Sequence, residues 1–285
     1  MSTATTWAKS DRQRERERLR RRDARRSGAV ATASTVGVFG LAVWALVSSP
    51  GWPRVRETFF SWSEFAGSFG DVLSGFWVNV QIFLIAEPII LVVGLAVALA
   101  RGVRTPAFFP LRALAVAYTD VFRGIPTILL VYLVGFGVPA LNLSGAPSSP
   151  LALGVIALVL SYGAYVAEVF RAGIASVHPS QLAAARSLGL SRPQALRYVV
   201  LPQAIRTVVP PLLNDFASLQ KDTALVAVLG VIEALRQAQI HSALTFNYTP
   251  YLAAALLFVL LTVPLARFTD WLAARAERRR APGDR

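Results

Sequence analysis

The sequence predicts an all-α, polytopic membrane protein that crosses the bilayer with six helices. Of its 285 residues, 54% are hydrophobic and only 16% are charged, and the mean hydropathy is +0.51. A soluble chain of this length has to spread charged residues over its surface, whereas here they are gathered between long apolar runs. The absence of cysteine also excludes a disulfide scaffold, a thiolate metal site and a cysteine nucleophile. Composition therefore argues against a soluble enzyme.

Six apolar stretches have the length of about 20 residues that a helix needs to cross the hydrocarbon core. They cover residues 29–47, 72–100, 113–138, 151–176, 208–232 and 251–268. A Pro-Gly-Trp-Pro sequence at 50–53 ends the first stretch, and Trp52 suits the membrane interface. The fifth stretch is the least regular, because Asp215, Lys221 and Asp222 interrupt it.

The distribution of Lys and Arg predicts that both termini lie in the cytoplasm, since cytoplasmic loops carry the excess of these residues. Four segments that fall on the same side of the six spans hold 24 of the 29 basic residues: 1–28, 101–112, 171–206 and 267–285. This asymmetry accounts for the formal net charge of +13 without any nucleic-acid partner. The arginine-rich tail over 1–28 is expected either to be solvated or to contact anionic lipid headgroups.

The segment between the fourth and fifth spans, residues 176–206, is longer than a simple connection and predicts two short helices. Gly189 marks the end of the first helix. Ser191 and Gln194 have the spacing of a capping box at the start of the second. Pro202 is expected to stop or kink that second helix.

Two roles of this helix pair fit its residues. Its arginines could meet lipid phosphates if the pair lies as an amphipathic hairpin at the membrane surface. Alternatively, the pair could dock into a groove of a cytoplasmic partner, because the three alanines at 183–185 favour close contact with protein over insertion into lipid. The residue types alone leave both roles open.

The residues from 183 to 202 follow a regular spacing. Residues 183–190 read A-A-A-R-S-L-G-L, and nine residues separate Gly189 from Val199, with Leu-Pro two positions later. This spacing resembles the coupling loop of ABC importer permeases, E-A-A, three residues, G, nine residues, I, one residue, L-P. Ala183 replaces the glutamate of that pattern, which removes a charged contact to an ATPase. The resemblance implies an ATPase-coupling role for Ala183, Ala184, Ala185, Arg186, Gly189, Leu190, Val199, Leu201 and Pro202.

Three further stretches resemble the polar amino-acid branch of the same permeases. Residues 122–126 read F-R-G-I-P and are similar to the family's F-R-G-T-P, and 162–174 resemble its approach to the coupling loop. Residues 214–225 resemble its N-x-F-x-S-L-x-K-D-S/T-x-L stretch. The resemblance divides the chain into an arginine-rich tail at 1–28, an additional first helix at 29–49, a five-helix type I importer domain at 70–275 with its coupling loop at 176–206, and a basic cytoplasmic tail at 276–285.

What the resemblance implies is a permease subunit in the cytoplasmic (plasma) membrane that moves a polar amino acid by alternating access. The implied partners are ABC ATPase subunits, an extracytoplasmic substrate-binding protein and a second permease copy, identical or related. ATP and Mg are expected on the partner ATPase, because this chain has no phosphate-binding G-x-x-x-x-G-K-[ST] motif. No cofactor or metal is expected on the chain itself, and we expect it not to be an enzyme.

Two other classes of membrane protein were weighed. A secondary transporter driven by an ion gradient is the alternative, but inverted repeats with discontinuous helices, which it predicts, are not evident in the sequence. An intramembrane enzyme would need a nucleophile with a base or a metal cluster. The only two histidines, His178 and His241, fall on opposite sides of the predicted topology.

Polar residues in the fifth span are candidates for the substrate path, because ionisable groups at membrane depth are costly. Asn214, Ser218 and Lys221 or Asp222 follow one another at steps of three or four, which places them on one helix face. An amino acid is a zwitterion and needs a cation for its carboxylate and an acceptor for its ammonium group. Lys221 and Asp222 supply these types, but adjacent residues point about 100° apart on a helix, and a role in gating or packing is the alternative to substrate contact.

Glu168 and Arg171 are candidates for a gate, or for a simple ion pair, at the i,i+3 spacing just before the coupling loop. Glu87 precedes Pro88 within the second span, where its carboxyl group either satisfies backbone groups freed by the proline or lines the path.

Asp120 and Arg123 have the same i,i+3 spacing in the third span. We expect them to form a structural ion pair that helps to place a kink at Gly124 and Pro126.

Overall fold

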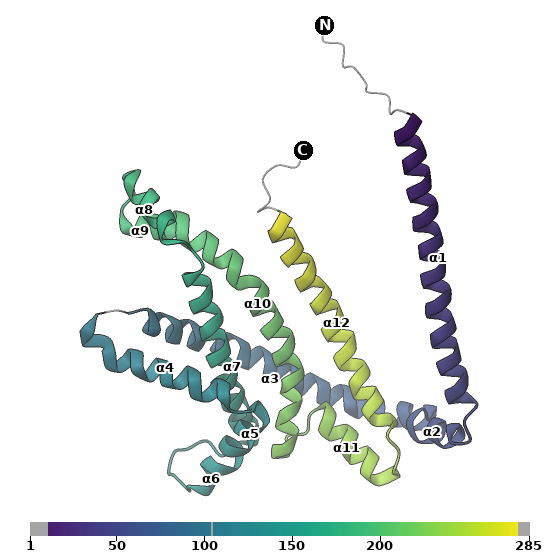
Figure 1. Cartoon of the computed structure of the whole chain (residues 1–285). Helices are drawn as coiled ribbons and strands as arrows, with labels where there is room; N and C mark the ends of the chain where they lie inside the picture. Colours follow the sequence, from purple (N-terminus) through teal and green to yellow (C-terminus); the bar gives the residue numbers. More distant parts are fainter. Residues whose placement is uncertain (1–10, 104, 279–285) are drawn as a thin grey trace. The chain divides into compact units, whose positions relative to one another are not determined.

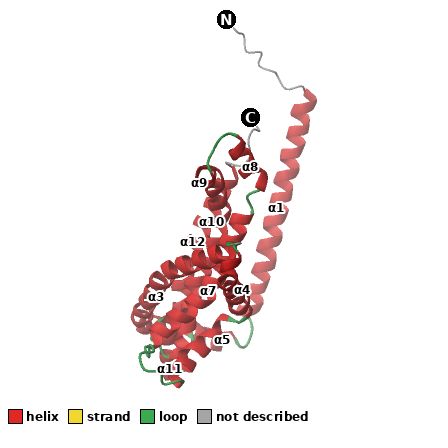
Figure 2. Ribbon diagram, turned by 90° about the vertical axis from the view of Figure 1, so that its left-hand side faces the viewer, coloured by secondary structure: helices red, strands yellow, loops and turns green. Residues whose placement is uncertain are grey.

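The computed structural model describes residues 11–103 and 105–278, and within these ranges it consists of helices and connecting loops without any strand (Figure 2). The ends of the predicted tails at 1–28 and 276–285 lie outside the described residues. The chain divides into two compact units, Met1–Glu57 and Thr58–Arg285.

In the first unit, the arginine-rich stretch and the first predicted span form one continuous helix, α1 (Asp11–Val47). Its part Arg26–Val47 is long and apolar enough to cross a membrane. A turn at Ser48–Gly51 leads to the short helix α2 (Trp52–Phe59), whose last residues enter the second unit.

The second unit holds the remaining helices (Figure 1). They are α3 (Trp62–Gly102), α4 (Phe109–Gly124), α5 (Thr127–Tyr132), α6 (Val138–Ala140), α7 (Pro150–Ala175), α8 (Pro179–Ser187), α9 (Arg192–Ala195), α10 (Leu201–Asp222), α11 (Ala234–Thr245) and α12 (Thr249–Arg278). Helix α3 begins after Ser61, whose hydroxyl accepts a hydrogen bond from the Glu64 backbone N–H, and it continues through Pro88 without ending. It is therefore longer than the predicted span at 72–100.

The third predicted span, 113–138, is not one helix. Helix α4 ends at Gly124, and the chain bends by 107° before it continues from Thr127. Ile125 adopts an extended conformation because the ring of Pro126 disfavours helical geometry in the residue before it. The predicted kink is thus a full break in the helix.

The fifth predicted span, 208–232, belongs to a much longer helical stretch that runs continuously over Pro193–Leu229. Pro202 does not stop it, because a π-helical turn at Leu196–Val200 precedes the proline, and the Leu201 N–H bonds to the Leu196 carbonyl. The inserted residue of such a turn accommodates local strain in a helix. Of the two predicted effects of Pro202, a stop or a kink, the stop is therefore wrong, and the irregularity next to the proline is the π-helical turn.

The number of spans depends on the two bent helices. Four single helices in the described residues are long and apolar enough to cross a membrane, and the number rises to six if each bent pair is one span. The second bent pair turns by 50° between Leu229 and Ala234. The prediction of an all-α membrane fold is confirmed, and six spans agree with the upper count.

The core that positions the functional residues lies where α3, α7 and α10 pack together. Buried side chains from all three helices meet there, and they include Ile82, Ile90, Leu158, Val166 and Leu219. This packing fixes the positions of the polar side chains that line the space between α7 and α10.

Candidate functional site

The segment between α7 and α10 folds as the predicted helical hairpin. His178 caps α8, its Nδ1 accepting from the Ser180 N–H at 3.2 Å. At the other end of α8, the Leu190 N–H bonds to the Ala185 carbonyl at 3.2 Å and the Gly189 N–H to the Arg186 carbonyl at 3.0 Å. These two bonds form a Schellman cap, which requires a left-handed residue, and Gly189 has φ +86°.

The second helix of the hairpin begins as the capping box predicts, at least in one of its two bonds. The Gln194 side-chain oxygen accepts from the Ser191 N–H at 2.9 Å. Ala185 of α8 and Ala195 of α9 are both buried. These two positions therefore lie on the inner side of the hairpin.

The outer surface of the hairpin carries most of the predicted coupling residues. Ala183, Ala184, Arg186 and Gly189 are exposed, and the neighbouring Leu188 side chain is 85% exposed. Leu190, Val199 and Pro202 are half-buried, and Leu201 is exposed at the start of α10. The two halves of the motif thus lie on α8 and on the beginning of the long Pro193–Leu229 helix.

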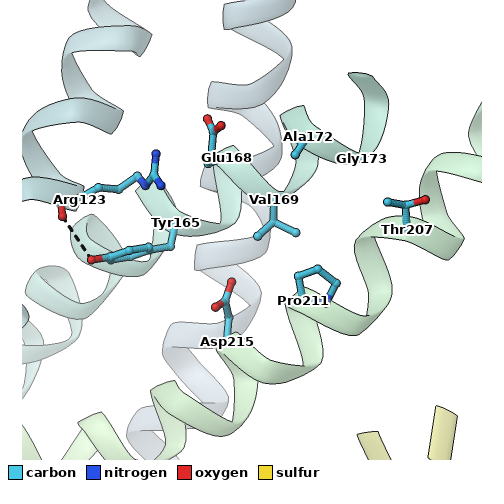
Figure 3. Close-up of a pocket in the computed structure, with 9 residues that line it drawn as sticks. All are labelled: Arg123, Tyr165, Glu168, Val169, Ala172, Gly173, Thr207, Pro211 and Asp215. Carbon is cyan, nitrogen blue, oxygen red and sulfur yellow. Dashed lines mark hydrogen bonds between the residues drawn. The ribbon is translucent and has the colours of Figure 1, made fainter. Parts of the chain in front are cut away.

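A pocket of about 270 Å³ lies between α7, α10 and the end of α4 (Figure 3). Its lining residues are Arg123, Tyr165, Glu168, Val169, Ala172, Gly173, Thr207, Pro211 and Asp215. No group of three or more His, Asp or Glu side chains in the described ranges is placed to hold a metal ion. The pocket is lined by charged and hydrogen-bonding side chains together with apolar ones.

Asp215 is the unusual residue of this pocket. Its Oδ2 atom is buried and has no hydrogen-bond partner within the described part of the chain. Glu87 on α3 interacts electrostatically with it, so two carboxyl groups from different helices lie near each other. A buried polar atom without a partner is costly, which marks Asp215 as a candidate ligand-binding residue that the sequence analysis recorded only as an interruption of the fifth span.

Arg123 supplies positive charge to the same pocket. Its guanidinium lies 5.8 Å from the centre of the Tyr165 ring, and the Tyr165 hydroxyl donates to the Arg123 carbonyl at 3.3 Å (Figure 3). The salt bridges of the described residues do not include a pair between Arg123 and Asp120. The predicted ion pair is therefore replaced by a contact with an aromatic ring, because the break after Gly124 leaves Arg123 at the end of α4 beside α7.

Glu168 and Arg171 form the predicted pair, with Arg171 Nε donating to Glu168 Oε2 at 2.9 Å and its Nη2 donating to Oε1. A third member was not predicted: Arg101, at the end of α3, donates from Nη1 to Glu168 Oε2 at 2.8 Å. In the sequence, Arg101 is distinguished only as one of the basic residues of the cytoplasmic segment 101–112.

The predicted polar face of α10 divides in the structure. Asn214 and Lys221 are exposed and Ser218 is half-buried, so these three share a side of the helix as expected. Asp222 points elsewhere, because the Tyr162 hydroxyl of α7 donates to its Oδ2 at 2.8 Å.

A buried polar cluster at the far end of α10 was not predicted at all. Asn79 Nδ2 donates to Glu233 Oε2 at 2.9 Å and to Thr223 Oγ1 at 3.1 Å, and Asn79 Oδ1 accepts from the Ala234 N–H at 3.1 Å. Glu233 also caps α11 by accepting from the N–H groups of Leu235 and Arg236. We call Asn79, Thr223 and Glu233 the polar node.

Residues 90–278 match the family described as binding-protein-dependent transport system inner membrane component. The chain belongs to this family. It is 35% identical over 214 residues to a probable glutamine ABC transporter permease of Bacillus subtilis, covering 74% of this chain and 95% of that protein. It is 33% identical over 195 residues to an arginine transport system permease of the same organism, covering 68% of this chain and 87% of that protein.

Solved structures agree with this assignment. The crystal structure of an amino acid ABC transporter with histidines matches at a TM-score of 0.67 with 32% identity, covering 76% of this chain and 98% of that one. The chain is thus a multi-pass inner membrane component of an ABC transporter, and ATP hydrolysis takes place in separate ATPase subunits. Family membership implies an ATPase and a substrate-binding protein as partners, and it sets aside the secondary transporter.

Proposed function

We propose that this permease subunit moves a polar amino acid, together with a second permease copy that is either identical or related. The observation that carries the proposal is the buried Oδ2 atom of Asp215, which has no hydrogen-bond partner in the described residues and belongs to a pocket that Arg123 also lines. The amino-acid names of the relatives support the same class of substrate. We also propose that both termini lie in the cytoplasm, which the distribution of Lys and Arg supports.

The two charges of the pocket suit the two ends of a zwitterion. The Asp215 carboxylate would accept the ammonium group, and the Arg123 guanidinium would bind the carboxylate, for which its planar donors are well shaped. Glu168 cannot serve as the ammonium acceptor, because two arginines already occupy its carboxylate. Asn214, Ser218 and Lys221 share an exposed face of α10, where the second permease copy would close the path.

The helical hairpin is the proposed docking element for the ATPase, which carries ATP and Mg. Its exposed outer surface and its Gly189 cap resemble a preformed element that inserts into a groove. Since α9 continues directly into α10, a displacement of the hairpin would move Thr207, Pro211 and Asp215 with it. Alternating access would follow from such a movement.

Uptake measurements on Asp215 variants test the substrate site. In proteoliposomes with the ATPase and binding protein, Asp215→Asn should raise the substrate concentration for half-maximal uptake about 10- to 100-fold, the usual effect of losing a charge-assisted hydrogen bond. Asp215→Glu should retain part of the activity. Asp270→Asn, on the exposed side of α12, is the matched control and should behave as wild type. Unchanged uptake by Asp215→Asn would overturn the assignment of the pocket.

A further inference from the structure

A single carboxylate joins two helices just before the hairpin begins. Glu168 on α7 accepts hydrogen bonds from Arg101 of α3, at 2.8 Å, and from Arg171 of its own helix. The Arg101 side chain is only 15% exposed and that of Glu168 is 24% exposed. Hydrogen bonds between ionised groups that are partly withdrawn from solvent are short and strong. We call these three residues the clasp.

The clasp lies between the pocket and the hairpin. Glu168 lines the pocket, and α7 ends shortly afterwards at Ala175, where the chain turns into α8. The same end of α7 lies very close to α10 at Gly173. A Cβ atom added there would lie 1.9 Å from Val208 Cγ2, so only glycine allows this approach. The end of α7 is thus held to α10 by close apolar packing and to α3 by charge.

We propose that Arg101 is a positioning residue for transport, which acts through Glu168 to make the end of α3 follow α7 when the hairpin moves. This inference rests on the proposed function. The link is directional and charged, so α3 and α7 can shift as one body while the apolar side chains around them keep their packing. Without Arg101, the end of α3 would lose its charged link to α7 and follow it less closely, while the shared core of the two helices stays packed.

In the described part of the second unit, three arginines pair with acidic residues, and comparing them distinguishes a role in transport from a role in stability alone. Arg101 joins two helices, whereas Arg171 pairs within α7 at i,i+3. Arg267 forms an exposed i,i+3 pair with Asp270 on α12 at 3.8 Å, far weaker in geometry. Replacing Arg101 should therefore uncouple helices, replacing Arg171 should weaken the clasp less, and replacing Arg267 should change nothing.

The first experiment compares uptake with ATP hydrolysis in proteoliposomes that contain the ATPase and the binding protein. Arg101→Gln should lower uptake per ATP hydrolysed about tenfold, the factor that one charge-assisted hydrogen bond gives, while the ATPase stays bound. Arg101→Lys should restore part of the ratio, and Arg267→Gln should match wild type. A purely structural role would lower both activities together with the amount of inserted protein and leave the ratio unchanged, which would overturn the proposal.

A second experiment does not depend on the transported substrate. The chain has no cysteine, so Ala172→Cys places a single thiol in the pocket lining. Its labelling rate by a membrane-impermeant thiol reagent should change when ATP is added to the complex, and Arg101→Gln should abolish that change. If the labelling rate still changes with ATP in Arg101→Gln, the clasp proposal is wrong, even if the wild-type complex takes up a polar amino acid as proposed. If the change is lost as expected but no amino acid is taken up, the clasp stands and the proposed substrate is wrong.

Discussion

The two ends of the long Pro193–Leu229 helix are held in opposite ways. At the hairpin end, the outer surface is exposed, with Leu188 85% exposed. At the other end, the polar node is wholly buried, with Glu233 and Thr223 at 0% exposure and Asn79 at 1%. The pocket residues Thr207, Pro211 and Asp215 lie between these ends on the same helix.

This difference suggests that the long helix is held in place at the polar node and is free to move at the hairpin. In the node, the hydrogen bonds of Asn79 to Glu233, to Thr223 and to the Ala234 N–H are buried, and such satisfied networks are rigid. The hairpin is joined to the rest of the unit through α7 and α10 and presents its outer face to solvent. A force on the hairpin is therefore expected to move the pocket residues of α10 more than it moves the node.

Glu233→Ala should have the largest effect on stability. It removes the cap of α11 and one of the two buried acceptors of the Asn79 amide, so we expect a loss of about 2–4 kcal/mol in the free energy of unfolding. Thermal unfolding of the purified chain in detergent, followed by circular dichroism, measures it. Glu233→Gln keeps one acceptor oxygen for Asn79 and the Leu235 N–H but turns an NH2 group toward the Arg236 N–H, so it should lose less than Glu233→Ala. Equal melting temperatures of Glu233→Ala and wild type would show that the polar node does not hold this end of the helix in place.

Asn79→Ala should come next, at about 1–3 kcal/mol, because it leaves the Ala234 N–H without its partner. Since Asn79 and Glu233 share one network, the double variant with Glu233→Ala should lose less than the sum of the two single variants. If the losses in free energy of unfolding of the two single variants simply add in the double variant, Asn79 and Glu233 do not act as one network.

Gly189→Val should change stability least, by about 1–2 kcal/mol, because it strains only a left-handed position at the exposed end. Its functional effect should be large: the chain still inserts in the membrane, but the ATPase is lost during purification. Gly189→Asn is the matched variant, since asparagine tolerates this conformation, and it should retain the ATPase. Retention of the ATPase and full transport by the valine variant would argue against docking at the hairpin.

The parts of the site that were predicted correctly depend on local rules. Gly189 ends α8 and Gln194 caps the next helix because both act within a few residues of chain, so their spacing is readable in the sequence. The Glu168–Arg171 pair belongs to the same class. Asp215, by contrast, stands out only because no hydrogen-bond partner in the described ranges reaches its Oδ2 atom.

The sequence by itself determined the helical membrane fold, the hairpin and its caps, because these follow from hydropathy over one span and from bonds between near neighbours. The tertiary structure decided the break after Gly124, the clasp and the polar node. Arg101 meets Glu168 across 67 positions, and Asn79 meets Glu233 across 154. The sequence spacing of such pairs follows no rule. The partner of a polar group inside the membrane depends on which helices pack together, and the high cost of leaving that group without a hydrogen bond requires that it has one.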